Sequence, residues 1–117
     1  MITIILNHQP YDGTDVTWNA LRLAKTLFES GEGVNLFLMN DAVDLARDNT
    51  VKPDSYDNDL VAMVKKLHEK GVALQACGTC NARCGIHKNT PYFDEKIAST
   101  MAKLAEWVKE SRQVLTF

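Results

Sequence analysis

Apolar residues recur along this chain in two alternating patterns. Short, nearly continuous apolar runs rich in β-branched residues are typical of strands whose sheet is covered on both faces. Residues 2–7, 34–39 and 72–76 are expected to form such strands, and residues 112–117 are expected to form the last strand. Between the runs, apolar residues recur every three to four positions, which is the spacing of one face of an α-helix.

This helical spacing predicts three amphipathic helices. Their apolar stripes are Val16, Ala20, Leu23, Ala24 and Leu27; Leu60, Met63, Val64 and Leu67; and Ile97, Met101, Leu104, Ala105 and Val108. The helix of the third stripe is expected to follow Asp94. A further short helix is expected at residues 42–47.

Strands that alternate with helices predict a mostly parallel sheet with helices on both faces. A length of 117 residues is enough for one hydrophobic core. We therefore expect a single α/β domain over residues 1–117, with a sheet of about five strands. In such sheets ligands and reactive groups gather at the carboxyl edge, which here receives the loops at residues 8–13, 40–43 and 77–85.

Composition and charge narrow the possible partners. The net charge of −2 and the lack of a lysine- or arginine-rich run argue against binding to nucleic acid. The longest apolar runs have the length of strands, so no membrane span is expected. The first apolar run is interpreted as a strand rather than a signal peptide, and three cysteines do not make a disulfide framework. These features together predict a cytoplasmic protein.

The most informative stretch follows the third apolar run. All three cysteines, Cys77, Cys80 and Cys84, lie there with Arg83 and His87 close by, and glycines follow Cys77 and Cys84. Only the thiolate of a cysteine is a good nucleophile, and backbone N–H groups or a cation stabilise it. A cysteine at the end of a strand, with a cation in the loop that follows, suits a thiol that attacks or carries a sulfur atom.

The residues alone leave other interpretations open. Cys77 and Cys80 have the spacing of a dithiol redox pair. With Cys84 and His87 they could bind zinc or an iron–sulfur cluster, although the spacing is more compact than in most such sites. The cysteines could also be small buried apolar residues. His8 is interpreted as a polar loop residue, with a general base near the cysteines as the alternative.

Several segments together resemble a known family. They are residues 9–11, 19–24, 36–43, 77–80, 105–107 and 114–117. With these segments the chain resembles the DsrE/DsrF-like family over its whole length, and most closely the YchN-like branch of that family. The resemblance implies a flavodoxin-like three-layer α/β fold and a homo-oligomer, a trimer or a hexamer.

The resemblance also implies a function. Several relatives carry sulfane sulfur on a cysteine and pass it from a donor protein to an acceptor protein. The family pattern of a cysteine followed by Arg-x-Gly implies that Cys77 carries the persulfide, with Arg83 matching the arginine and Cys80 matching the second cysteine of the YchN-like branch. Such a sulfurtransferase-type carrier needs no cofactor and no substrate pocket. Cys84 and His87 fall outside the pattern, so the alternative of a metal-binding or structural oligomer stays open.

Overall fold

The chain folds into one parallel sheet with helices on both of its faces. The computed structural model describes residues 1–78 and 91–117. In chain order the elements are β1 (Ile2–Leu6), α1 (Val16–Glu29), β2 (Val34–Leu38), the 3₁₀ helix η1 (Asn40–Ala46), α2 (Leu60–Lys70), β3 (Ala73–Cys77), the 3₁₀ turn η2 (Glu95–Ile97), β4 (Ala98–Ser99), α4 (Met101–Glu110) and β5 (Gln113–Thr116). The four predicted strands are confirmed to within one residue at each end.

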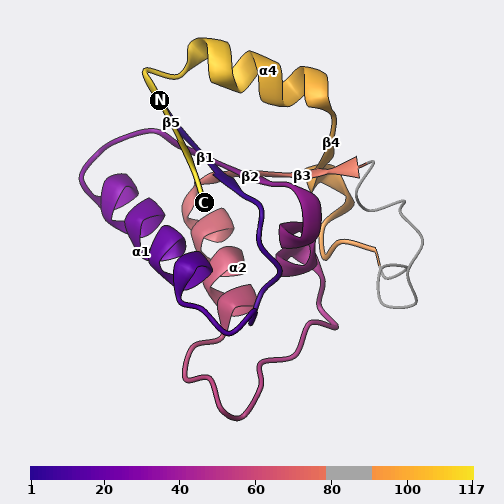
Figure 1. Cartoon of the computed structure of the whole chain (residues 1–117). Helices are drawn as coiled ribbons and strands as arrows, with labels where there is room; N and C mark the ends of the chain where they lie inside the picture. The colour runs from indigo at the N-terminus through magenta and orange to yellow at the C-terminus, as the bar shows by residue number, and fades with distance from the viewer. Residues whose placement is uncertain (79–90) are drawn as a thin grey trace.

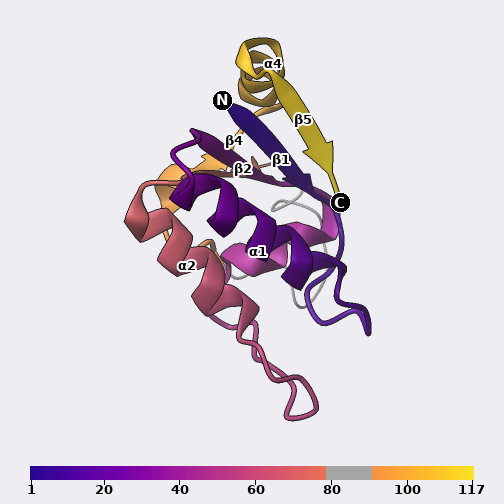
Figure 2. The ribbon, with the colours of Figure 1, turned by 90° about the vertical axis from the view of Figure 1, so that its left-hand side faces the viewer.

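The strands lie in the order β4-β3-β2-β1-β5, and every neighbouring pair is parallel. α1 and α2 lie on one side of the sheet and α4 lies on the other (Figure 1). The view turned by 90° shows the same three layers, with β5 beside β1 at the edge (Figure 2). The predicted α/β class and three-layer arrangement are therefore confirmed.

Alternation along each strand divides the core between the two faces. Phe37 of β2 packs edge-on against Trp107 of α4, with 5.9 Å between the ring centroids. Because successive strand residues point to opposite faces, the neighbours Leu36 and Leu38 point toward α1 and α2. Both leucines are fully buried. The second strand is thus covered on both faces, as its continuous apolar run predicts.

The region before α4 differs from the prediction of one helix that begins after Asp94. The Asp94 carboxylate does accept from an N–H, that of Lys96 at 2.9 Å, but it caps only the single turn η2. The chain then forms β4, whose Ser99 pairs with Cys77, and α4 starts only after Thr100. Pairing with the free edge of β3 is a tertiary interaction that helical periodicity does not reveal.

The third apolar stripe is consequently only partly buried. Leu104 lies in the core, whereas Met101, Ala105 and Val108 are exposed, and Ile97 is buried in η2 rather than in the helix. The other buried residue of α4 is Trp107, outside the predicted stripe. The sheet therefore covers a different strip of α4 from the one that the sequence pattern suggests.

Candidate functional site at the carboxyl edge

The parallel strands place the ends of β1, β2 and β3 along one edge of the sheet. Cys77 is the last residue of β3, so this predicted site residue does lie at the carboxyl edge. The residue is buried, with 8% of its surface exposed. Cys80, Arg83, Cys84 and His87 lie outside the described residues. Cys77 is thus the one predicted cysteine that the described part of the chain locates.

Three contacts fix the backbone around Cys77. The residue pairs with Ser99 of β4. The Tyr92 hydroxyl donates a buried hydrogen bond of 2.7 Å to the Cys77 carbonyl oxygen. Gly78 lies so close to β4 that a Cβ at this position would stand 3.0 Å from the Ser99 carbonyl oxygen. The chain therefore leaves β3 in a fixed direction, and a side chain in place of Gly78 would press against the β4 backbone.

A buried arginine lies next to this arrangement. The Arg47 side chain is 1% exposed, and its Nε donates to Asp44 Oδ1 at 2.9 Å. The Arg47 guanidinium carbon lies 5.2 Å from the centroid of the Tyr92 ring, a cation–π distance. Sequence reasoning missed both Arg47 and Tyr92. An arginine at the end of a predicted helix is normally solvated, so the sequence holds no signal for its burial.

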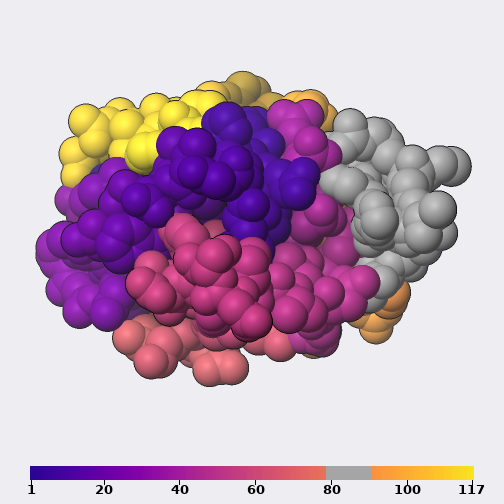
Figure 3. All heavy atoms as spheres, turned by 60° about the horizontal axis from the view of Figure 1, so that its bottom comes forward, coloured from indigo at the N-terminus to yellow at the C-terminus, as the bar shows by residue number. Residues whose placement is uncertain are grey.

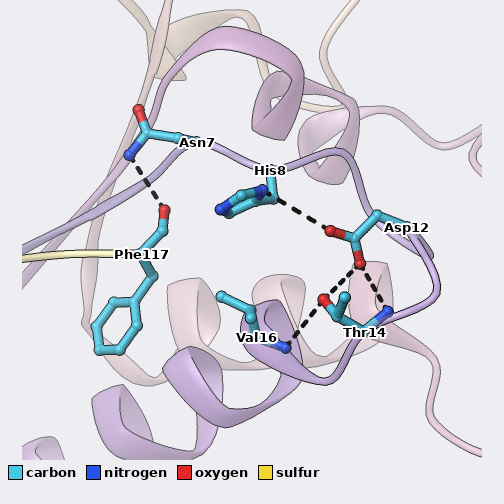
Figure 4. Close-up of polar contacts among 6 residues, drawn as sticks. All are labelled: Asn7, His8, Asp12, Thr14, Val16 and Phe117. Carbon is cyan, nitrogen blue, oxygen red and sulfur yellow. Dashed lines mark hydrogen bonds and ion pairs between the residues drawn. The ribbon is translucent and has the colours of Figure 1, made fainter.

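The loop after β1 makes its own polar network at the same edge. The Thr14 hydroxyl donates to Asp12 at 2.7 Å, and its N–H donates to the same oxygen at 3.0 Å (Figure 4). These bonds, the hydroxyl first, hold the pKa of Asp12 below its usual value. His8 Nδ1 lies 3.7 Å from the other Asp12 oxygen, and half of the His8 side chain is exposed. His8 is thus a loop residue paired with a carboxylate.

Two residues at this edge adopt left-handed backbone conformations that are rare outside glycine. They are Tyr11 after β1, with φ of 62°, and Asn40 after β2, with φ of 51°. Asn40 is held by a 3.0 Å hydrogen bond from its Nδ2 to Asn7 Oδ1. The Tyr11 hydroxyl accepts from the Leu60 N–H, which ties the first loop to the start of α2. The edge is therefore built from loops with defined conformations.

The first loop also packs against the segment that precedes α2. Tyr11 and Tyr56 meet edge-on with 5.6 Å between ring centroids, and the Tyr56 hydroxyl donates to Asp15 at 3.0 Å. In the space-filling view the indigo atoms of the first loop lie against the magenta and pink atoms around residues 50–60 (Figure 3). These contacts close the space between the two segments.

The described residues hold neither a cluster of metal ligands nor a helix that could cross a membrane. Residues 1–78 and 91–117 contain no group of three or more His, Cys, Asp or Glu side chains that could hold a metal ion. Because three of the four predicted ligands lie in the remaining segment, the metal interpretation stays untested. In the same described ranges no helix combines the length and the apolar character that a membrane crossing needs.

This chain is similar to known proteins over its whole length. The model of the DsrE/DsrF-like family matches residues 1–117. The protein YchN of Escherichia coli is 34% identical over 118 residues, which cover 99% of this chain and 97% of YchN. An uncharacterised protein of Methanopyrus kandleri is 33% identical over 117 residues, covering 100% of this chain and 93% of that protein.

The structural comparison gives the same result. The crystal structure of YchN from E. coli matches with a TM-score of 0.84 at 33% sequence identity, covering 99% of this chain and 97% of that chain. The similarity thus extends over the complete sheet and both helical layers. The chain belongs to the DsrE/DsrF-like family, in its YchN-like branch.

Proposed function

We propose that this protein is a sulfur-relay protein that carries sulfane sulfur as a persulfide on Cys77. The family is associated with sulfur relay. The observation that carries the proposal is the position of Cys77, which ends β3 at the carboxyl edge of a parallel sheet. Low exposure suits a carrier, because it limits the access of oxidants and water to a bound persulfide.

The proposed chemistry is two successive thiolate attacks. In loading, the Cys77 thiolate attacks the outer sulfur of a donor protein's persulfide. The Cys77–sulfur bond forms, the donor's S–S bond breaks, and the donor leaves as a thiolate. In delivery, a nucleophile of the acceptor protein attacks the same outer sulfur, and Cys77 leaves as a thiolate. The two steps balance without any other oxidant or reductant.

The roles of the neighbouring residues rest on the sequence alone. We propose that Arg83 stabilises the anionic sulfur and that Cys80 is the secondary thiol. A Cys80 thiolate that attacks the inner sulfur of the Cys77 persulfide would form a Cys77–Cys80 disulfide and release hydrosulfide. Cys84 has no part in this scheme. Since donor and acceptor bring their own reactive groups, the activity is that of a sulfurtransferase-type carrier without a cofactor.

We further propose that the protein is a cytoplasmic homo-oligomer, a trimer or a hexamer. The cytoplasm is reducing and keeps the three cysteines available as thiols. The exposed apolar side chains of Met101 and Val108 on α4 and of Val114 on β5 support assembly. Phe37 faces α4, and its pairing partner Ile5 in β1 points the same way. Thr3 lies two residues before Ile5 and therefore shares that face, as does its own partner Val114. Val114 thus lies on the side of the sheet that carries α4.

Single cysteine variants test the proposal. The intact protein and its Cys77→Ser, Cys80→Ser and Cys84→Ser variants are treated with a sulfane-sulfur donor, and mass spectrometry counts the sulfur atoms bound to each. We expect Cys77→Ser to lose loading and the matched control Cys84→Ser to keep it. Equal loading of Cys77→Ser and the unmodified protein, or loss of loading in Cys84→Ser alone, would overturn the assignment.

Metal analysis of the same samples separates the two functions. The proposed relay protein needs no metal for folding, because apolar side chains from the sheet and from both helical layers form its core. We therefore expect the purified protein to keep its thermal unfolding temperature when a chelator is added. Stoichiometric zinc or iron, together with unfolding by the chelator, would favour the metal-binding alternative with Cys77, Cys80, Cys84 and His87 as ligands.

A further inference from the structure

A small groove lies between the two helices on one side of the sheet. α1 and α2 run side by side there (Figure 1, Figure 2). The pockets that hold drug-sized ligands have volumes of roughly 300–1,000 Å³. The groove has a volume of about 170 Å³, so its occupant must be smaller than such a ligand. It is lined by Leu21, Lys25, Met63, Lys66, Leu67 and Lys70.

The buried part of this lining is apolar. Leu21 is fully buried and Leu67 is 4% exposed, whereas Met63 is half-buried. Met63 and Leu67 are four residues apart and therefore share one face of α2, where they meet Leu21 of α1 at the groove. An aliphatic chain in the groove would leave water, which strengthens binding about fourfold for each buried methylene.

The exposed residues of the lining are all lysines. Lys25, Lys66 and Lys70 are exposed, and among the described residues no carboxylate lines the groove. The neighbouring acidic residue of α2, Glu69, lines a separate cavity. The groove is thus locally positive on a chain whose net charge is −2.

These positive charges have little compensation within the fold. Lys25 pairs with Glu29 at 3.9 Å, but more than half of each side chain is exposed, so the pair is weak. Within the part of the chain that the structure describes, Lys66 and Lys70 form no ion pair. They are four residues apart on α2, a spacing at which like charges destabilise a helix. An anion bound in the groove would relieve this repulsion.

We propose that the groove between α1 and α2 binds a small amphiphilic anion. The ligand is an aliphatic carboxylate, whose chain lies against Leu21, Met63 and Leu67 and whose charge meets the lysines. Its small volume favours such a ligand over a protein segment, because a stable protein interface covers about 800 Å² of each partner.

This site goes beyond the proposed relay and is separate from it. Lys70 lies three residues before β3 begins, whereas Cys77 ends that strand. The groove therefore lies toward the amino edge of the sheet, away from the cysteine. α4 covers the other side of the sheet, so the proposed oligomer leaves the groove open (Figure 1).

The test uses octanoate as the probe. The protein is labelled at its leucine and methionine methyl groups and titrated with octanoate, while NMR follows the methyl signals. We expect the signals of Leu21, Met63 and Leu67 to shift. Octylammonium has the same chain with the opposite charge and should leave them unchanged. Butanoate should bind more weakly than octanoate, by about fourfold for each methylene that the groove no longer buries.

Lysine variants test the role of the charge. Lys66→Gln and Lys70→Gln should each weaken octanoate binding about threefold, the effect of losing one exposed ion pair. Lys109→Gln is the matched control, because it removes the same charge from an exposed position on α4, across the sheet. This variant should keep the affinity of the parent protein.

The outcomes decide between the possible occupants. Equal binding of octanoate and octylammonium, or equal weakening by Lys66→Gln and Lys109→Gln, would overturn the inference. It would also be wrong if an acidic peptide of glutamate and leucine shifts the three methyl signals and octanoate does not, since the groove would then dock a protein segment. If a lysine variant does not fold, the comparison of octanoate with octylammonium on the parent protein decides. None of these results depends on whether Cys77 binds sulfur.

Discussion

At the scale of single residues, Tyr56 holds its proton more tightly than an ordinary tyrosine. Desolvation is the main cause, and the hydrogen bond to the negatively charged Asp15 adds to it. Together they raise the pKa of Tyr56 from 10.0 to about 12. A raised pKa in the folded state means that the neutral side chain stabilises the fold. This contribution is fully present below pH 10.0 and is lost as the pH rises through about 12.

The perturbed tyrosine can be titrated directly. We expect the ultraviolet titration of phenolate absorbance to contain a step near pH 12 that Tyr56→Phe removes. Asp15→Asn should move this step to lower pH without restoring the ordinary value, because desolvation is the larger cause. If the parent minus Tyr56→Phe difference titrates near pH 10.0, neither the desolvation of Tyr56 nor its hydrogen bond to Asp15 is present in solution.

Single residues also show why part of the site is invisible in the sequence. The position of Cys77 at the end of a strand is predictable, because an apolar run ends just before it and a glycine follows it. The burial of Arg47 is not predictable, because its contact with Tyr92 joins residues that are distant in the sequence and meet only in the folded chain. A charged residue at the end of a predicted helix is normally solvated. Its position becomes evident only when the elements are packed together.

At the scale of elements, β4 positions β3 although it contains only two residues. Its close approach depends on Gly78, whose missing side chain leaves room for the Ser99 carbonyl. No period-two pattern marks so short a strand, so the apolar spacing of this region predicts a helix instead. β1 and β2 are predictable because their apolar runs reflect burial on both faces of the sheet. A strand such as β4, which forms only by pairing with another strand, has no such pattern in its sequence.

Two glycine variants test the contact between Gly78 and β4. Gly78→Ala forces backbone atoms of β4 to move, and we expect it to lower the free energy of unfolding by about 1–3 kcal/mol. Gly33→Ala is the matched control, because its added methyl meets only the flexible end of the Met1 side chain. That change should stay within about 0.5 kcal/mol. Denaturant unfolding measures the free energy of unfolding of both variants. Equal losses of free energy in the two variants would contradict the role of Gly78.

At the scale of the whole molecule, the side of the sheet that carries α4 is incompletely covered. Met101 and Val108 lie seven residues apart and therefore share one face of α4, yet both are exposed. The predicted apolar stripe of this helix thus extends beyond the part that contacts the sheet. Contact with a second copy of the chain would bury the remainder, which agrees with the proposed oligomer.

Paired substitutions locate this interface. Met101 is 61% exposed, and Met101→Lys should weaken assembly while the subunit stays folded. Val51 is 79% exposed in the segment before α2, away from α4, so Val51→Lys is the matched control and should leave the assembly intact. Light scattering measures the molecular mass of the parent protein and of each variant. A parent protein that is monomeric at micromolar concentration would refute the oligomer, and dissociation by Val51→Lys alone would place the interface elsewhere.

The pairing of β1 with β5 determines the order in which the chain can fold. β1 is the second strand from one side of the sheet, and its outer neighbour β5 comes last in chain order among the strands of this sheet. Hydrogen bonds join Phe117 to Ile5 and Asn7, so β1 gains its second neighbour only when the final residues are present. Until then a growing chain exposes one edge of β1 to pairing with other chains. Completion of the sheet is therefore a late, non-local step of folding.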